Sequence, residues 1–162
     1  MKSETKSKIK TFIIALIIPL AIGGLSAFLT RNNMDIYKEI NSPPFSPPSI
    51  VFSIVWPILY VLMGISSALI WINRQKDIEN ATKGLVYYAV SLVFNFEWSL
   101  IFFNFKRYLL AFIWLLAMLY FIIRMVIAYK KVCPVAAYLQ IPYVVWVTFA
   151  GYLTFGIWWL NR

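Results

Sequence analysis

The chain alternates between long apolar runs and short polar segments, and this pattern predicts its fold. Five runs, at about residues 9–29, 50–72, 85–103, 109–129 and 135–160, are each dominated by apolar side chains. A helix needs roughly 17–25 residues to cross the hydrocarbon core of a bilayer, and each run is long enough. Backbone polar groups in lipid must be paired within their own segment, so each run is predicted to be a transmembrane helix. We expect an all-α integral membrane protein, a five-transmembrane-helix bundle with a single domain over residues 1–162.

The composition supports this prediction and excludes many enzyme classes. The chain is 62% hydrophobic and 13% charged, whereas a soluble domain has about 45–50% apolar and about 25% charged residues. There is no histidine, which excludes His-dependent nucleophile pairs and His ligands to haem or zinc. The single cysteine, Cys133, excludes an intramolecular disulfide and a multi-cysteine metal cluster. We therefore predict no metal site and no required cofactor.

The net charge of +9 does not indicate a nucleic-acid partner. The basic residues stand in short groups between the apolar runs, which is typical of membrane proteins, whereas a nucleic-acid binder has a basic face. Nine Lys and Arg fall on the side of the N-terminus and five on the other side. This bias predicts a multi-pass protein, in the cell membrane if bacterial, with its N-terminus in the cytoplasm. The first apolar run is longer than the usual signal-peptide core, so we predict a span there.

The first connection, residues 30–48, is the only long one, and it ends in an unusual segment. Four prolines lie within residues 43–48. Proline fixes φ and favours extended geometry in the residue before it. We expect a stiff, polyproline-like strap leading into the second helix, although a plain linker would have the same sequence.

Several polar residues lie inside the predicted spans. Intramembrane charges usually face the bundle interior or a cavity. Glu97 is predicted either to point into a polar cavity or to be protonated at neutral pH, as desolvation favours. Arg124 is near a span end, where its side chain can extend to the interface. The two differ in depth by roughly 12 Å at about 1.5 Å per residue, so no ion pair between them is expected. Asn95 is a candidate for a hydrogen bond between helices.

The aromatic residues form two groups. Three tryptophans stand at span ends, where an interfacial belt is their usual role: Trp71, Trp158 and Trp159. Four others lie inside spans: Trp56, Trp98, Trp114 and Trp146. On the same helix faces, Tyr60 follows Trp56 by four residues and Tyr143 precedes Trp146 by three. These side chains either fill the core or form a wall for a planar apolar ligand.

Three segments resemble motifs of one known family. Residues 43–60, with the prolines followed by Phe52, Trp56, Leu59 and Tyr60, are similar to P-x-W-x-P-P…F…W-x-x-L-Y. Residues 95–103 are similar to the family's L-N-x-x-W-S-x-x-F-F, and residues 142–150 to P-Y-x-x-W-x-x-F-A. The chain thus resembles the translocator protein family, the tryptophan-rich sensory proteins (TspO/MBR).

The resemblance implies a membrane receptor-like protein, commonly a homodimer, that binds porphyrins such as protoporphyrin IX in a cavity under the first loop. A sensory or regulatory role is the expected function. The alternatives are a light- and oxygen-dependent porphyrin-degrading catalyst, with Trp56 and Trp146 as redox partners, and a small tetrapyrrole transporter. From the resemblance and the helix faces together, the expected ligand-binding residues are Tyr37, Phe45, Trp56, Tyr60, Asn95, Trp98, Tyr143 and Trp146.

The chain departs from the family pattern at several positions. Phe45 replaces the tryptophan of the proline segment, and Trp114 replaces an acid that many members carry early in the fourth helix. The sterol-recognition pattern of animal members is not kept, because Phe155 and Trp159 occupy its tyrosine and basic positions. Sterol binding is therefore not predicted.

Overall fold

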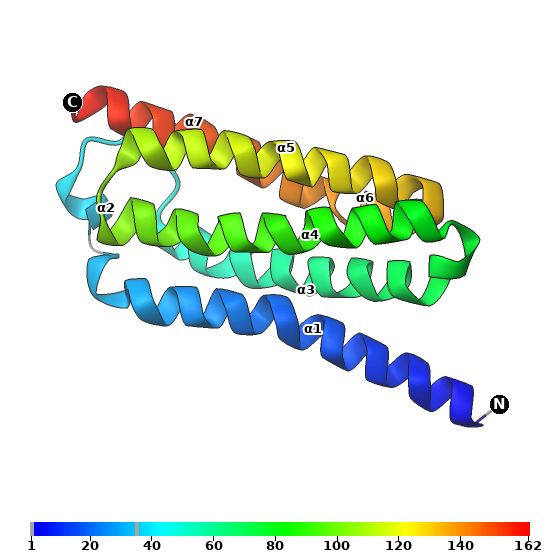
Figure 1. Cartoon of the computed structure of the whole chain (residues 1–162). Coiled ribbons are helices and arrows are strands. Elements are labelled where there is room, and N and C mark those ends of the chain that lie inside the picture. Colours follow the sequence, from blue (N-terminus) through cyan, green and yellow to red (C-terminus); the bar gives the residue numbers. More distant parts are fainter. Residues whose placement is uncertain (1, 35) are drawn as a thin grey trace.

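The computed structural model describes residues 2–34 and 36–162, and within these residues it is a bundle of helices without strands (Figure 1). Five helical stretches are long and apolar enough to cross a membrane: Glu4–Asn33, Ser49–Lys76, Ile78–Asn104, Tyr108–Val132 and Pro134–Leu160. The prediction of a five-transmembrane-helix bundle is thereby confirmed.

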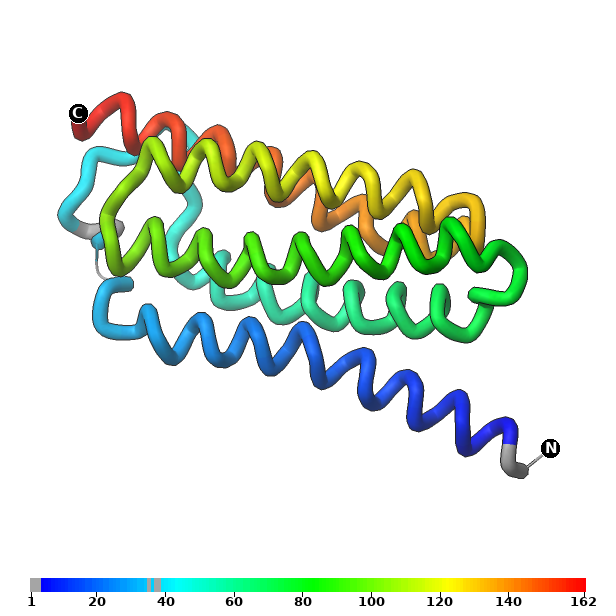
Figure 2. Tube along the Cα trace, viewed as in Figure 1, coloured from blue at the N-terminus to red at the C-terminus, as the bar shows by residue number. Residues whose placement is uncertain are grey.

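The long helices are joined by short helical turns. In chain order the elements are α1 (Lys2–Thr30), η1 (Arg31–Asn33), α2 (Ile36–Glu39), α3 (Ser49–Asn73), η2 (Arg74–Lys76), α4 (Ile78–Ser99), η3 (Leu100–Asn104), α5 (Tyr108–Val132), α6 (Pro134–Tyr138) and α7 (Ile141–Leu160). Helices α3, α4, α5 and α7 run roughly parallel in one bundle, and α1 diverges from it toward the N-terminus (Figures 1 and 2). The divergence leaves the first half of α1 less closely packed than the second.

Helices α1 and α3 approach closely near their midpoints because Gly64 has no side chain. A Cβ at Gly64 would stand 2.8 Å from the Leu16 Cα and 2.9 Å from the Ala15 carbonyl oxygen. Both neighbouring atoms are backbone, so they cannot rotate away. Small residues at helix contacts are the usual way to bring two backbones together in lipid.

The third membrane helix begins earlier than the hydropathy pattern predicts. Helix α4 starts at Ile78 instead of residue 85, because Asp77 caps it. The Asp77 carboxylate accepts a hydrogen bond from the Asn80 backbone N–H at 3.0 Å. That bond holds the pKa of the Asp77 carboxyl below its usual value. The first two turns of α4 are therefore polar and lie outside the predicted span.

The fifth predicted span is divided into two helices. Helix α6 ends at Tyr138 and α7 begins at Ile141. Pro142 lies in the first turn of α7, where its missing N–H would have no helical partner in any case. By contrast, α1 continues through Pro19 and α3 through Pro57.

The proline-rich strap, residues 41–48, is bound to the end of α7. The Asn161 side chain accepts a hydrogen bond from the Asn41 N–H at 2.9 Å and donates one to the Asn41 carbonyl at 2.8 Å. The Tyr152 hydroxyl donates to the Pro44 carbonyl at 2.9 Å. The predicted polyproline-like strap is interrupted at Phe45, where the chain turns and φ is 63°.

The contact at Gly64 yields a stability prediction. In Gly64→Ala, the new Cβ would push α1 away from α3, and overpacking of this kind costs about 1–3 kcal/mol. Gly24→Ala is the matched control, since nothing lies within 4 Å of a Cβ at Gly24. Thermal unfolding in detergent should show a lower Tm for Gly64→Ala and an unchanged or higher Tm for Gly24→Ala. Equal Tm values for the two variants would contradict the close approach.

Candidate functional site

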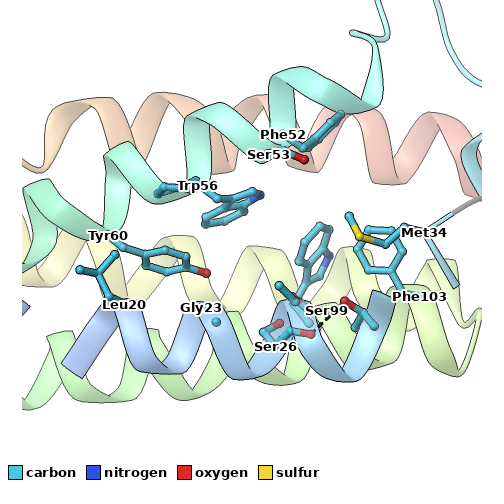
Figure 3. A pocket seen from close by; sticks show the side chains of 15 residues that line it. Leu20, Gly23, Ser26, Met34, Phe52, Ser53, Trp56, Tyr60, Ser99 and Phe103 are labelled. Carbon is cyan, nitrogen blue, oxygen red and sulfur yellow. Dashed lines mark hydrogen bonds between the residues drawn. The ribbon is translucent and has the colours of Figure 1, made fainter. Parts of the chain in front are cut away.

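A cavity of about 370 Å³ lies between α1, α3 and the end of α4 (Figure 3). We call it the aromatic cavity. Helix α1 and the residues after it contribute Leu20, Gly23, Gly24, Ser26, Ala27, Thr30 and Met34. Helix α3 contributes Phe52, Ser53, Trp56, Pro57 and Tyr60, and the third wall consists of Trp98, Ser99 and Phe103. None of these lining residues carries a formal charge, so the walls favour an apolar occupant.

Aromatic rings form the walls contributed by α3 and α4. Trp56 and Tyr60 are one turn apart on α3, and their rings stack with centroids 5.7 Å apart. The Trp98 ring of α4 lies 6.3 Å from that of Trp56. The Trp98 Nε1–H is buried and has no hydrogen-bonding partner among the described residues. One wall of the cavity thus carries an unused hydrogen-bond donor among aromatic rings.

Three helices meet at Tyr60, which stands at the inner end of the aromatic cavity. Its hydroxyl donates a hydrogen bond to the Asn95 Oδ1 on α4 at 2.8 Å. Its ring lies against Gly23 of α1, where a Cβ would be 2.1 Å from the ring atom Cε2 (Figure 3). The ring therefore needs glycine at position 23 in order to take this place.

The outer end of the cavity is closed by the start of the first connection. The Asn33 side chain donates to the Asn104 Oδ1 at 2.8 Å, and the Asn104 amide donates to the Leu29 carbonyl at 3.3 Å. Met34 and Phe103 lie together at this end (Figure 3). These amides fasten the beginning of the loop to the π-helical turn η3. The proline-rich strap, by contrast, is fastened to α7.

Half of the predicted ligand-binding residues lie at the aromatic cavity. Trp56, Tyr60 and Trp98 line it. Asn95 is directly behind the wall and binds the Tyr60 hydroxyl. Their placement agrees with the predicted helix faces.

Three of the other predicted residues, Phe45, Tyr143 and Trp146, are not in the walls of this cavity. Phe45 is 90% exposed on the strap. Tyr143 is buried against α5, with its hydroxyl 3.6 Å from the Met118 sulfur. Trp146 packs behind Phe52, with ring centroids 5.4 Å apart. The side chain of Tyr37 is outside the described residues.

The structure gives the intramembrane carboxyl group a partner that was not predicted. The Trp114 Nε1–H of α5 donates to the Glu97 carboxylate at 3.2 Å. The Trp114 ring is held by stacking on Phe94 of α4, with centroids 4.9 Å apart. Arg124 lies elsewhere on α5, with its guanidinium 5.7 Å from the centre of the Tyr87 ring. As expected, Glu97 and Arg124 are not paired.

Five membrane-crossing helices, three of which enclose a cavity whose described lining residues are aromatic, small or apolar and carry no charge, define a small multi-pass integral membrane protein. The model of the TspO/MBR family matches residues 15–160, and the chain belongs to that family.

Named relatives match over most of their own length. Tryptophan-rich protein TspO of Chlorobaculum tepidum is 32% identical over 155 residues, which are 95% of this chain and 98% of that protein. Translocator protein of Bos taurus is 31% identical over 147 residues, which are 90% of this chain and 87% of that protein. Protein CrtK of Rhodobacter capsulatus is 32% identical over 125 residues, which are 77% of this chain and 78% of that protein. The similarity therefore extends over the whole bundle.

The Glu97–Trp114 contact predicts that removing Trp114 alone lowers the Tm more than replacing both side chains. Trp114→Phe removes the donor and leaves a half-buried carboxyl group without its partner, so its Tm in detergent should fall. Adding Glu97→Leu to Trp114→Phe should bring the Tm most of the way back to that of the unmodified protein, because neither polar group then remains. A double variant less stable than Trp114→Phe would show that the contact does not stabilise the bundle.

Proposed function

We propose that the protein binds a porphyrin, or a similar planar apolar molecule, in the aromatic cavity as part of a sensory or regulatory role. The observation that carries this proposal is the arrangement of Trp56 and Trp98, two indoles 6.3 Å apart on an uncharged cavity wall. Indole rings favour flat aromatic partners because offset stacking adds to the burial of apolar area. Membership of the TspO/MBR family supports the same ligand class.

The size and lining of the cavity suit a flat ligand. A volume of about 370 Å³ falls within the range of about 300–1,000 Å³ typical of small-molecule sites. The α1 wall opposite the indoles has small residues, Gly24, Ser26 and Ala27, which leave room for a ring system.

A porphyrin with carboxylate side chains also needs a polar end. Arg31 follows Thr30, the last α1 residue in the cavity wall, and its guanidinium lies 4.2 Å from the Phe28 ring centroid. We propose that Arg31 pairs with the ligand carboxylates at the outer end, since guanidinium groups bind carboxylates through paired hydrogen bonds. The tetrapyrrole plane would then lie deeper, between α1 and the indoles.

A titration of the purified protein in detergent tests this proposal. Protoporphyrin IX added in the dark should quench tryptophan fluorescence saturably and shift the Soret band. Trp56→Phe and Trp98→Phe should each weaken binding about two- to tenfold, the loss expected for one stacking contact. Trp159→Phe is the matched control, because Trp159 is exposed at the end of α7. Arg31→Gln should weaken binding of protoporphyrin IX but not of its dimethyl ester.

Illumination separates binding from breakdown. A complex whose Soret band is stable in light supports the binding function. Protein-dependent loss of the band, absent in Trp56→Phe and Trp146→Phe, would replace the proposal with the degradative alternative. The absence of saturable quenching, or an equal effect of Trp159→Phe and Trp56→Phe, would refute the proposed site.

A further inference from the structure

The aromatic cavity is exposed along one side of the bundle, between α1 and α3. Four of its lining residues lie on the outer surface of these two helices: Gly24, Ala27, Ser53 and Pro57. We call these four residues the lateral opening. A Cβ at Gly24 would have nothing within 4 Å. The rings of Trp56 and Tyr60 lie directly inside, in the space between the two helices (Figure 3).

The lateral opening lies at the depth of lipid chains. Gly24 precedes the end of α1 at Thr30 by six residues, a depth of about 9 Å at about 1.5 Å per residue. Pro57 follows the start of α3 at Ser49 by eight residues, a depth of about 12 Å. The two helices are each long and apolar enough to cross a membrane. Both edges of the opening are therefore well inside the membrane-spanning parts of the helices.

The residues beside the lateral opening are apolar and exposed. Leu25 and Phe28 of α1 are 52% and 57% exposed, and Ile54 and Ile58 of α3 are 55% and 54% exposed. Large apolar side chains on the surface of a membrane-spanning helix face the hydrocarbon of the bilayer. The lateral opening therefore connects the aromatic cavity with lipid chains, whereas water is at the ends of the helices.

The outer end of the cavity is closed, in contrast to its side. The Asn33 amide donates to the Asn104 side chain at 2.8 Å, and the Asn104 amide donates to the Leu29 carbonyl at 3.3 Å. Ile36 of α2 is 5% exposed and belongs to the hydrophobic core. A ligand that passed through this end would have to break these hydrogen bonds and lift an apolar side chain from the core.

The edges of the lateral opening offer much less resistance. On the α1 edge, Gly24 and Ala27 have no polar side-chain atom, so they form no side-chain hydrogen bond across the gap. Helices α1 and α3 touch further inward, where the backbone of Leu16 lies against Gly64. That contact holds the two helices together while their outer halves stand apart around the indoles.

We propose that the planar ligand enters and leaves the aromatic cavity sideways from the bilayer, through the lateral opening between α1 and α3. This inference rests on the binding function proposed above and concerns the route to the same site. The ligand is then drawn from molecules dissolved in the hydrocarbon of the membrane. The first connection is a fixed cover over the outer end, and the ligand passes beside it.

Stopped-flow kinetics in lipid nanodiscs, followed by the Soret band in the dark, test this route. Gly24→Trp and Ser53→Trp each place a large ring at one edge of the opening. Each should slow both association and dissociation of protoporphyrin IX about tenfold or more, because the barrier to passage rises. Dissociation is measured with excess albumin as the acceptor. A ring that merely filled the cavity would instead speed the loss of bound ligand.

The neighbouring positions provide matched controls. Leu25→Trp and Ile54→Trp add the same ring to the same helices, at exposed residues outside the cavity lining. Both rates should stay within about twofold of those of the unmodified protein, a small change in barrier height.

A cross-link across the outer end is the complementary test. Asn33→Cys and Asn104→Cys, in a Cys133→Ser background, are joined by a short bifunctional thiol reagent. This link fixes the beginning of the first connection to η3, where the two amides already meet. Association and dissociation should continue within about twofold of their rates before cross-linking, because the route does not pass this end.

Three outcomes would overturn the lateral route. The first is arrested exchange in the cross-linked protein, which would place the route at the outer end. The second is an unchanged dissociation rate in both Gly24→Trp and Ser53→Trp. The third is equal slowing by Leu25→Trp and Gly24→Trp. Failure of the binding function is a different result, because the unmodified protein would then show no saturable binding.

Discussion

The hydrogen bond from the Tyr60 hydroxyl to the Asn95 Oδ1 is the interaction on which the aromatic cavity depends. Both side chains are buried within a membrane-spanning bundle, where no water replaces a lost partner. The bond fixes the Tyr60 ring between α3 and α4. Gly23 then allows α1 to lie against the ring. The positions of the three helices around the cavity therefore follow from one polar contact and one missing side chain.

The aromatic walls extend from this contact along both helices. Trp56 stacks on Tyr60 one turn away on α3, and Trp98 lies one turn beyond Asn95 on α4. The hydrogen bond thus sets the register in which the two indoles face the same space. At the outer end, the amide of Asn104 holds the beginning of the first connection in place. The cavity is bounded by polar contacts at both ends and by rings between them.

The sequence predicts the membrane helices well because an apolar run of the required length has few alternatives in lipid. It predicts helix ends less well, since Asp77 starts α4 outside the apolar run and Pro142 starts α7 within one. Helix spacing placed Trp56 with Tyr60 correctly. It grouped Tyr143 and Trp146 with them, yet these two lie behind the wall. Periodicity shows which residues share a helix face, but not which helix that face meets.

A double-mutant cycle of Tyr60→Phe and Asn95→Leu, measured as unfolding free energy in detergent, tests the central claim most directly. If the hydrogen bond holds α3 to α4, each single variant loses about 1–3 kcal/mol, because a buried partner is left unpaired. The double variant should then lose less than the sum, with a coupling energy of about 0.5–3 kcal/mol. Tyr120→Phe, at an exposed position of α5, should change little. Strictly additive losses would contradict the account.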